Sequence, residues 1–118
     1  MIVGVQGSRN FNDYSVFLRA IGTTLSMLDQ SGDKELTIMS AGPSKVNSFA
    51  LEFVNVSERS LKARGIRAKV VRVPAAWFKT NMHDVQYFMY FSLPKESVSD
   101  LVREADDKDI EVGIYRYA

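Results

Sequence analysis

A glycine, a serine and an arginine follow the first apolar segment of the chain and could together bind an anion. The segment reads Val3-Gly4-Val5-Gln6-Gly7-Ser8-Arg9-Asn10, and a helix is expected soon after it, capped by Asn12 or Asp13. Gly7 lets the backbone approach a ligand, and the free N–H groups of a helix start attract phosphate. Arg9 could add a bidentate phosphate contact. This pattern predicts a site for a nucleotide or a sugar phosphate.

Two further loops place small or polar residues after predicted strands. One is Ser40-Ala41-Gly42-Pro43-Ser44, where Ser44 either donates to phosphate or only caps the next helix. The other is Ser92-Leu93-Pro94-Lys95. In a parallel sheet the carboxyl ends of the strands share one edge, where ligands bind near the topological switch point. We therefore expect these loops to meet the Gly7-Ser8-Arg9 loop in one pocket.

The spacing of apolar residues predicts the elements that position these loops. Strands are expected at residues 1–5, 36–39, 68–73, 85–91 and 111–115. Helices are expected after Asn12, from about Ser44 to a glycine stop at Gly65, and from Pro94 onward. The order strand-helix-strand-helix-strand, loop, strand-helix-strand predicts an α/β domain with a mostly parallel five-stranded sheet and helices on both faces.

Composition restricts the chemistry. The chain has 118 residues, the size of one domain, and its 46% hydrophobic content is that of a globular protein. The absence of cysteine excludes disulfides and fits a cytoplasmic setting, and no apolar run approaches the roughly 18 residues of a membrane span. With His83 as the lone histidine, His-rich zinc sites are excluded, and neither a metal nor a cofactor is expected. A net charge of +1 gives no general argument for nucleic acid.

Charge is nevertheless uneven along the sequence. Residues 59–79 hold seven basic side chains and no acidic one, whereas residues 96–111 hold seven acidic side chains against Arg103 and Lys108. These segments are interpreted as solvated helix faces, as complementary patches for self-association, or as a weak nucleic-acid surface.

Three motifs resemble the SLOG superfamily, a group of Rossmann-like folds related to DNA-processing protein A and to the cytokinin-activating (LOG) phosphoribohydrolases. The first is Gly7-Ser8-Arg9-Asn10-Phe11-Asn12-Asp13. The second, residues 40–50, keeps the spacing of the family's Ser-Gly-Gly-Ala-x-Gly-x-Asp-x-x-Ala motif, with Ser40, Gly42 and Ala50 matched. The third, Val73-Pro74-Ala75-Ala76-Trp77, resembles the Pro-Ala-Asp-Trp segment of small stand-alone members. The resemblance implies one Rossmann-like three-layer, nucleotide-binding domain over residues 1–118, homo-oligomeric assembly, and an origin such as a phage or mobile element.

The chain departs from the family where its enzymes carry their catalytic loop. That loop reads Gly-Gly-x-Gly-Thr, with a glutamate a few residues on, whereas Phe91 to Val98 contains no glycine. Glu96 is a weak candidate for the catalytic carboxylate because its spacing differs. Lys45 and Asn47 stand where the family has a glycine and an acidic residue. These departures indicate a site that binds an anion without catalysis.

Three hypotheses follow. The chain binds a nucleotide as a sensor or sequestering protein, hydrolyses nucleoside monophosphates through Glu52, Asp84 or Glu96, or serves as a protein- or DNA-interaction module with a vestigial pocket. For Trp77 the alternatives are stacking on a nucleobase and packing in the core. For His83, beside Asp84, they are a surface position and a role as general base. The candidate ligand-binding residues are Gly7, Ser8, Arg9, Asn10, Phe11, Gly42, Pro43, Ser44, Lys45, Asn47, Trp77, Ser92 and Lys95.

Overall fold

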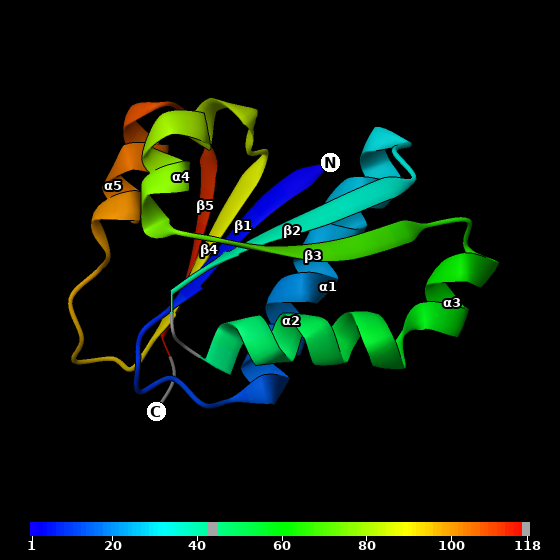
Figure 1. The fold of residues 1–118 in the computed structure, drawn as a ribbon, viewed down its shortest axis with the longest axis horizontal. Coiled ribbons are helices and arrows are strands. Elements are labelled where there is room, and N and C mark those ends of the chain that lie inside the picture. Colours follow the sequence, from blue (N-terminus) through cyan, green and yellow to red (C-terminus); the bar gives the residue numbers. More distant parts are fainter. Residues whose placement is uncertain (43–44, 117–118) are drawn as a thin grey trace.

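The five strands of the described chain form one parallel sheet in the spatial order β3-β2-β1-β4-β5 (Figure 1). The computed structural model describes residues 1–42 and 45–116. The elements are β1 (Ile2–Gly7), α1 (Tyr14–Ser31), β2 (Glu35–Ala41), α2 (Lys45–Val56), α3 (Glu58–Ala63), β3 (Arg67–Val73), α4 (Ala75–Asn81), the 3-10 helix η1 (Met82–Asp84), β4 (Tyr87–Ser92), α5 (Asp100–Asp107) and β5 (Glu111–Arg116). The predicted α/β class with a five-stranded, parallel sheet is confirmed.

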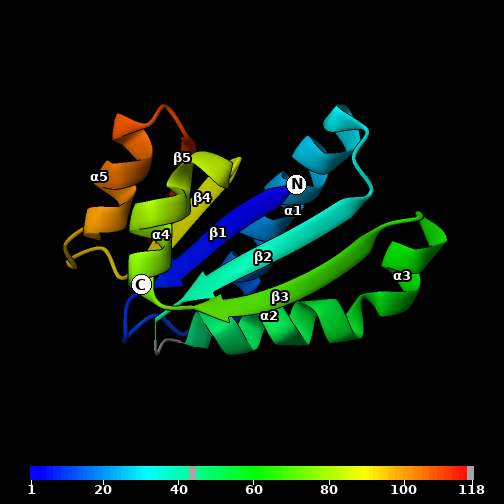
Figure 2. The ribbon, with the colours of Figure 1, turned by 45° about the horizontal axis from the view of Figure 1, so that its top comes forward.

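Helices cover both faces of the sheet, as the three-layer prediction requires (Figure 2). Helices α1 and α2 share one core cluster with one face of the sheet, and α4 and α5 share a second cluster with the other face. All six residues of β4 are buried, because this strand lies between β1 and β5 and is covered on both faces. Within the described residues, we find no helix that combines the length and the apolar character needed to cross a membrane.

Side-chain alternation decides which residues meet each helix layer. Val3 and Val5 of β1 pack toward α1 and α2, whereas Gly4 lies under α4. A Cβ atom on Gly4 would come within 2.6 Å of the Phe78 ring and 2.7 Å of the Phe88 ring. Glycine at this position therefore allows α4 to pack closely on the sheet.

The connections differ from the prediction in three places. The expected single helix after Ser44 is broken at Ser57, the cap of α3, following the weak helix formers Asn55 and Val56. The segment taken as a loop after the third strand contains α4 and η1, which start behind Pro74 and bury Phe78.

The helix expected from Pro94 is also wrong, because Pro94 lies in a turn and α5 starts only at Asp100. The Ser99 hydroxyl oxygen accepts the N–H of Leu101 at 3.2 Å, so the better N-cap fixes the start of the helix. Smaller differences concern strand ends. The first strand continues through Gly7, which is paired in register with Phe91, and the fourth begins at Tyr87 rather than Val85.

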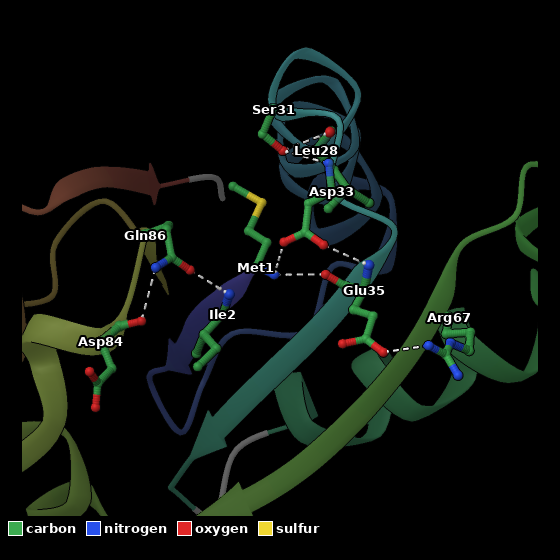
Figure 3. A network of polar contacts seen from close by, with 9 residues as sticks. All are labelled: Met1, Ile2, Leu28, Ser31, Asp33, Glu35, Arg67, Asp84 and Gln86. Carbon is green, nitrogen blue, oxygen red and sulfur yellow. Dashed lines mark hydrogen bonds and ion pairs between the residues drawn. The ribbon is translucent and has the colours of Figure 1, made fainter.

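Polar contacts tie the strands together at the amino edge of the sheet (Figure 3). The Met1 amine donates to Asp33 Oδ2 at 2.5 Å and to the Glu35 carbonyl at 2.8 Å. The Arg67 guanidinium pairs with Glu35 at 2.6 Å, and the Ile2 N–H donates to Gln86 Oε1 at 2.5 Å. Charged groups at this edge are thus largely paired with one another.

Candidate functional site

The carboxyl ends of β1 and β4 form the topological switch point of the sheet. The chain leaves β1 toward α1 on one face and leaves β4 toward α5 on the other. The Ser8 N–H donates to the Phe91 carbonyl at 2.8 Å, so the loops that follow the two strands start side by side. Asp13 Oδ1 accepts the Val16 N–H at 3.2 Å and caps α1, as predicted. In sheets of this kind, ligands bind in the crevice outside such a pair of strand ends.

The carboxylate of Glu96 lies between these two loops. Its Oε1 accepts hydrogen bonds from Ser8 Oγ at 2.6 Å and from the Leu93 N–H at 2.8 Å, and its Oε2 accepts from Asn10 Nδ2 at 3.3 Å. The Ser8 hydroxyl and then the Leu93 amide lower the pKa of Glu96 below its ordinary value. Donors predicted to hold a phosphate thus hold a carboxylate of the chain itself.

Four buried side-chain oxygens lack a hydrogen-bond partner within the described residues, and all four lie at the carboxyl edge. They are Gln6 Oε1, Ser40 Oγ, Asn47 Oδ1 and Ser92 Oγ. Ser40 and Ser92 are fully buried, at 0% exposed surface. Strand alternation places Ser40 on the side of α2, whose first turn carries Asn47, and places Gln6 and Ser92 on the side of α4 and α5. Such unpaired groups are rare in native proteins, where buried polar atoms nearly always have a partner in the protein or in ordered water.

Each strand also brings one basic side chain to this edge. These residues are Arg9 after β1, Lys45 at the start of α2 after β2, Arg72 near the end of β3, Lys95 after β4, and Arg116 at the end of β5. All five are exposed, and none forms an ion pair with a described residue. The carboxyl edge therefore carries positive charge that has no ion-pair partner within residues 1–42 and 45–116, in contrast to the amino edge.

Arg72 and Arg116 were not among the predicted site residues. In register, Arg72 pairs with Ser40, and Arg116 pairs with Ser92, so each stands beside a buried serine whose hydroxyl has no partner. Arg72 also donates to the Gly42 carbonyl at 3.4 Å. A basic residue at the end of each predicted strand was a signal in the sequence that would have indicated both.

Of the two aromatic residues predicted to contact a ligand, Phe11 lies in the core and Trp77 is partly exposed. Phe11 is only 1% exposed, and its ring centroid lies 5.2 Å from that of Phe91, so it belongs to the core and presents no ring to a ligand. Trp77 is half-buried and packs edge-on against Phe78, with ring centroids 5.2 Å apart. Gly42 adopts a left-handed conformation with φ of 91°, while Pro43 and Ser44 lie outside the described residues.

The other residues considered for catalysis lie in different parts of the fold. His83 and Asp84 precede β4 at the amino edge, where both are exposed, so Asp84 is wrongly placed for catalysis in the predicted pocket. Glu52 lines a hollow of about 440 Å³ between α1 and α2, together with Tyr14 and Lys45. In the part of the chain that the structure describes, no cluster of three or more histidine or acidic side chains could hold a metal ion.

The basic segment 59–79 does not form one continuous patch. Lys62, Arg64 and Arg67 pair with acidic side chains, and Arg67 and Arg72 lie at opposite ends of β3. In the acidic segment, Glu104 pairs with Lys108.

Comparisons of the chain with protein-family models, with curated proteins and with solved structures find no match. Membership of the SLOG superfamily therefore stays a prediction from the three motifs.

Proposed function

We propose that this protein binds a nucleotide or nucleotide-derived small molecule at the carboxyl edge of its sheet, as a sensor or sequestering protein. The observation that carries the proposal is the gathering of all four partnerless buried oxygens at that edge, within the described residues. A buried polar atom without a partner costs about 1–3 kcal/mol. A ligand that supplies hydrogen-bond donors there would recover this energy on binding.

The chemistry of the edge matches a ligand with an anionic part and a hydroxyl- or amine-bearing part. Arg9, Lys45 and Arg72 offer positive charge that forms no ion pair among the described residues, and the N-terminal end of α2 adds the positive end of its dipole. The amide oxygens of Gln6 and Asn47 are acceptors that suit a ribose hydroxyl or an amino group on a base. Nucleotides combine both parts in one small molecule.

Binding without catalysis is favoured over the hydrolase hypothesis. An N-glycosidic hydrolase needs a carboxylate free to stabilise an oxocarbenium-like sugar. Glu96 is held by three donors of the chain, and Asp84 lies at the opposite edge of the sheet. Release of free base from a nucleoside monophosphate would reverse this preference.

The interaction-module hypothesis has less support, because ion pairs with acidic neighbours occupy several of the basic residues between 59 and 79. A role on DNA would appear as a steep dependence of binding on salt concentration. The family resemblance adds homo-oligomeric assembly and a phage or mobile-element origin to the proposal, and the absence of cysteine adds a cytoplasmic location. Sedimentation of the purified protein tests the first of these.

Titration calorimetry with a panel of nucleoside mono- and diphosphates tests the proposal. Arg9→Ala should weaken binding by about 1.5–3 kcal/mol, the size of a hydrogen bond to a charged group, and leave the fold intact. Arg59→Ala is the matched control, because Arg59 is exposed on α3 and makes no ion pair with a described residue. Equal affinity in both variants would remove Arg9 from the site, and no binding by the wild type would contradict the proposal.

A further inference from the structure

We propose that the donors around Glu96 are an anion-binding subsite and that Glu96 is its internal ligand, which an incoming phosphate group displaces. This inference rests on the proposed function and deepens it. It assigns a chemical class, a phosphoryl or carboxylate anion, to the subsite made by Ser8, Asn10 and Leu93. It also makes Glu96 an inhibitory contact rather than a catalytic group.

The geometry around Glu96 is that of a bound anion. A charge-assisted O–H···O⁻ contact is typically 2.5–2.7 Å long, and Ser8 Oγ lies 2.6 Å from Glu96 Oε1. The same oxygen accepts the backbone N–H of Leu93 at 2.8 Å, and Asn10 Nδ2 reaches the second oxygen at 3.3 Å. A hydroxyl, a backbone amide and a side-chain amide are donors that protein sites offer to phosphate.

The position of the carboxylate supports the same inference. It joins the loops that follow β1 and β4, the pair of strand ends where the topology places a ligand crevice. Ser92, which directly precedes Leu93, is fully buried and its hydroxyl has no partner within the described residues. A ligand at these strand ends thus meets several donors that Glu96 already uses, beside a buried hydroxyl that lacks a partner.

Two basic residues without an ion pair are neighbours in the chain of the residues that form the subsite. Arg9 lies between Ser8 and Asn10 in the chain, and Lys95 directly precedes Glu96; both are exposed and form no ion pair with a described residue. A single carboxylate carries one negative charge, whereas a phosphate ester carries nearly two and three acceptor oxygens. A phosphate can therefore take over the donors of Glu96 and engage the flanking cations as well.

The exchange explains what the glycine-free loop after β4 does. Its residues 93–99 include no helix or strand, and the carboxylate of Glu96 fixes the turn by accepting the N–H of Leu93. When a phosphate binds these donors, Glu96 must leave them. Binding therefore breaks the hydrogen bonds that Glu96 makes in the free protein. Glu96 therefore lowers the apparent affinity for every anion that uses this subsite.

Calorimetry with pyrophosphate at neutral pH tests the inference on the wild type, Glu96→Gln, Glu96→Ala and the control Glu111→Gln. Glu111 is exposed at the amino end of β5, so its variant removes the same charge far from the subsite. Both Glu96 variants should bind pyrophosphate at least about tenfold more tightly than the wild type, because no charge-assisted hydrogen bond has to be broken first. The control should bind like the wild type.

The possible failures are distinguishable. Pyrophosphate binding by the wild type with no gain in either folded Glu96 variant overturns this inference and leaves the proposed function standing. Absence of pyrophosphate binding in every protein overturns this inference, and the nucleotide panel then decides the proposed function separately. If the variants do not fold, an NMR titration of the wild type gives the same decision. Saturating pyrophosphate should raise the pKa of the Glu96 carboxyl toward its ordinary value. An unchanged pKa contradicts displacement.

Discussion

The hydroxyl of Ser8 and the carboxylate of Glu96 lie 2.6 Å apart, although 88 positions of the chain separate them. The contact bridges the two loops at the switch point of the sheet, and Asn10 and the Leu93 amide complete it. The strand ends are thereby held together by an anion that the chain supplies. Under the proposal that an anion displaces Glu96, this contact couples the stability of the free protein to ligand binding.

Acid should weaken the wild-type protein more than a Glu96→Gln variant. The folded-state pKa of Glu96 is lowered from its ordinary 4.5, so its hydrogen bonds stabilise the fold fully above that value. This stability is lost as the pH falls through the folded pKa. The difference in free energy of unfolding between wild type and variant should therefore shrink below about pH 4.5. Urea denaturation at neutral and acidic pH measures it.

Asp13 and Asp33 provide the internal reference for this experiment, because hydrogen bonds lower both of their pKa values in the folded protein. Both carboxyls remain in the variant, which should keep part of the acid sensitivity. If the difference in free energy of unfolding between wild type and Glu96→Gln stays constant across the pH range, the ionised form of Glu96 is not stabilised by its hydrogen bond with Ser8.

Removing either buried serine hydroxyl should leave the free protein as stable as before or more stable. Ser40→Ala and Ser92→Ala delete oxygens that have no partner among the described residues, so the free energy of unfolding should be unchanged or rise by up to about 1 kcal/mol. Ser31→Ala is the control, since Ser31 Oγ donates to the Leu28 carbonyl at 2.8 Å, and its loss should cost about 1 kcal/mol.

The same serine variants should bind nucleotides less well than the wild type, because stability and ligand affinity are opposed at these positions. Chemical denaturation and calorimetry on one preparation compare the two quantities. A large loss of stability in both serine variants would mean that their hydroxyls serve the fold and not a ligand.

Two glycine substitutions should change stability in opposite directions. Gly4→Ala forces a methyl group against the rings of Phe78 and Phe88 and should lower the free energy of unfolding by about 1–3 kcal/mol. Gly22 lies in the exposed middle of α1, where a Cβ atom meets nothing within 4 Å. Gly22→Ala should raise the free energy of unfolding by about 0.5–1 kcal/mol. Thermal unfolding distinguishes the pair, and a neutral Gly4→Ala would show that α4 packs less closely than described.

The sheet could be predicted from the sequence because its signals are local. The apolar runs around Val5, Ile38 and Phe88 each mark a buried strand, the run around Val70 marks a half-buried edge strand, and the helical segments between them require parallel neighbours. The start of α5 was not predicted correctly, because two residues of the sequence offer alternative helix starts. Pro94 suggested a helix start, but Ser99 caps α5 instead, and the turn that Glu96 closes keeps Pro94 outside the helix.

The candidate site could be predicted only in part. Loop positions such as Ser8 and Arg9 follow from the ends of the strands, and they lie at the carboxyl edge as expected. The use of the Ser8 hydroxyl by Glu96 could not be foreseen, because it depends on how two distant loops pack. Partnerless oxygens such as that of Ser40 become visible only when every surrounding hydrogen bond is known.

The central claim, that the carboxyl edge binds a nucleotide, is tested most directly by mass spectrometry of bound small molecules. Purified wild type and Arg9→Ala would be incubated with a mixture of nucleotides, freed of unbound compounds, denatured and analysed. We expect a nucleotide to be released from the wild type and to be strongly depleted from the variant. Release of no phosphorylated compound from either protein, or of equal amounts from both, would contradict a nucleotide site built around Arg9.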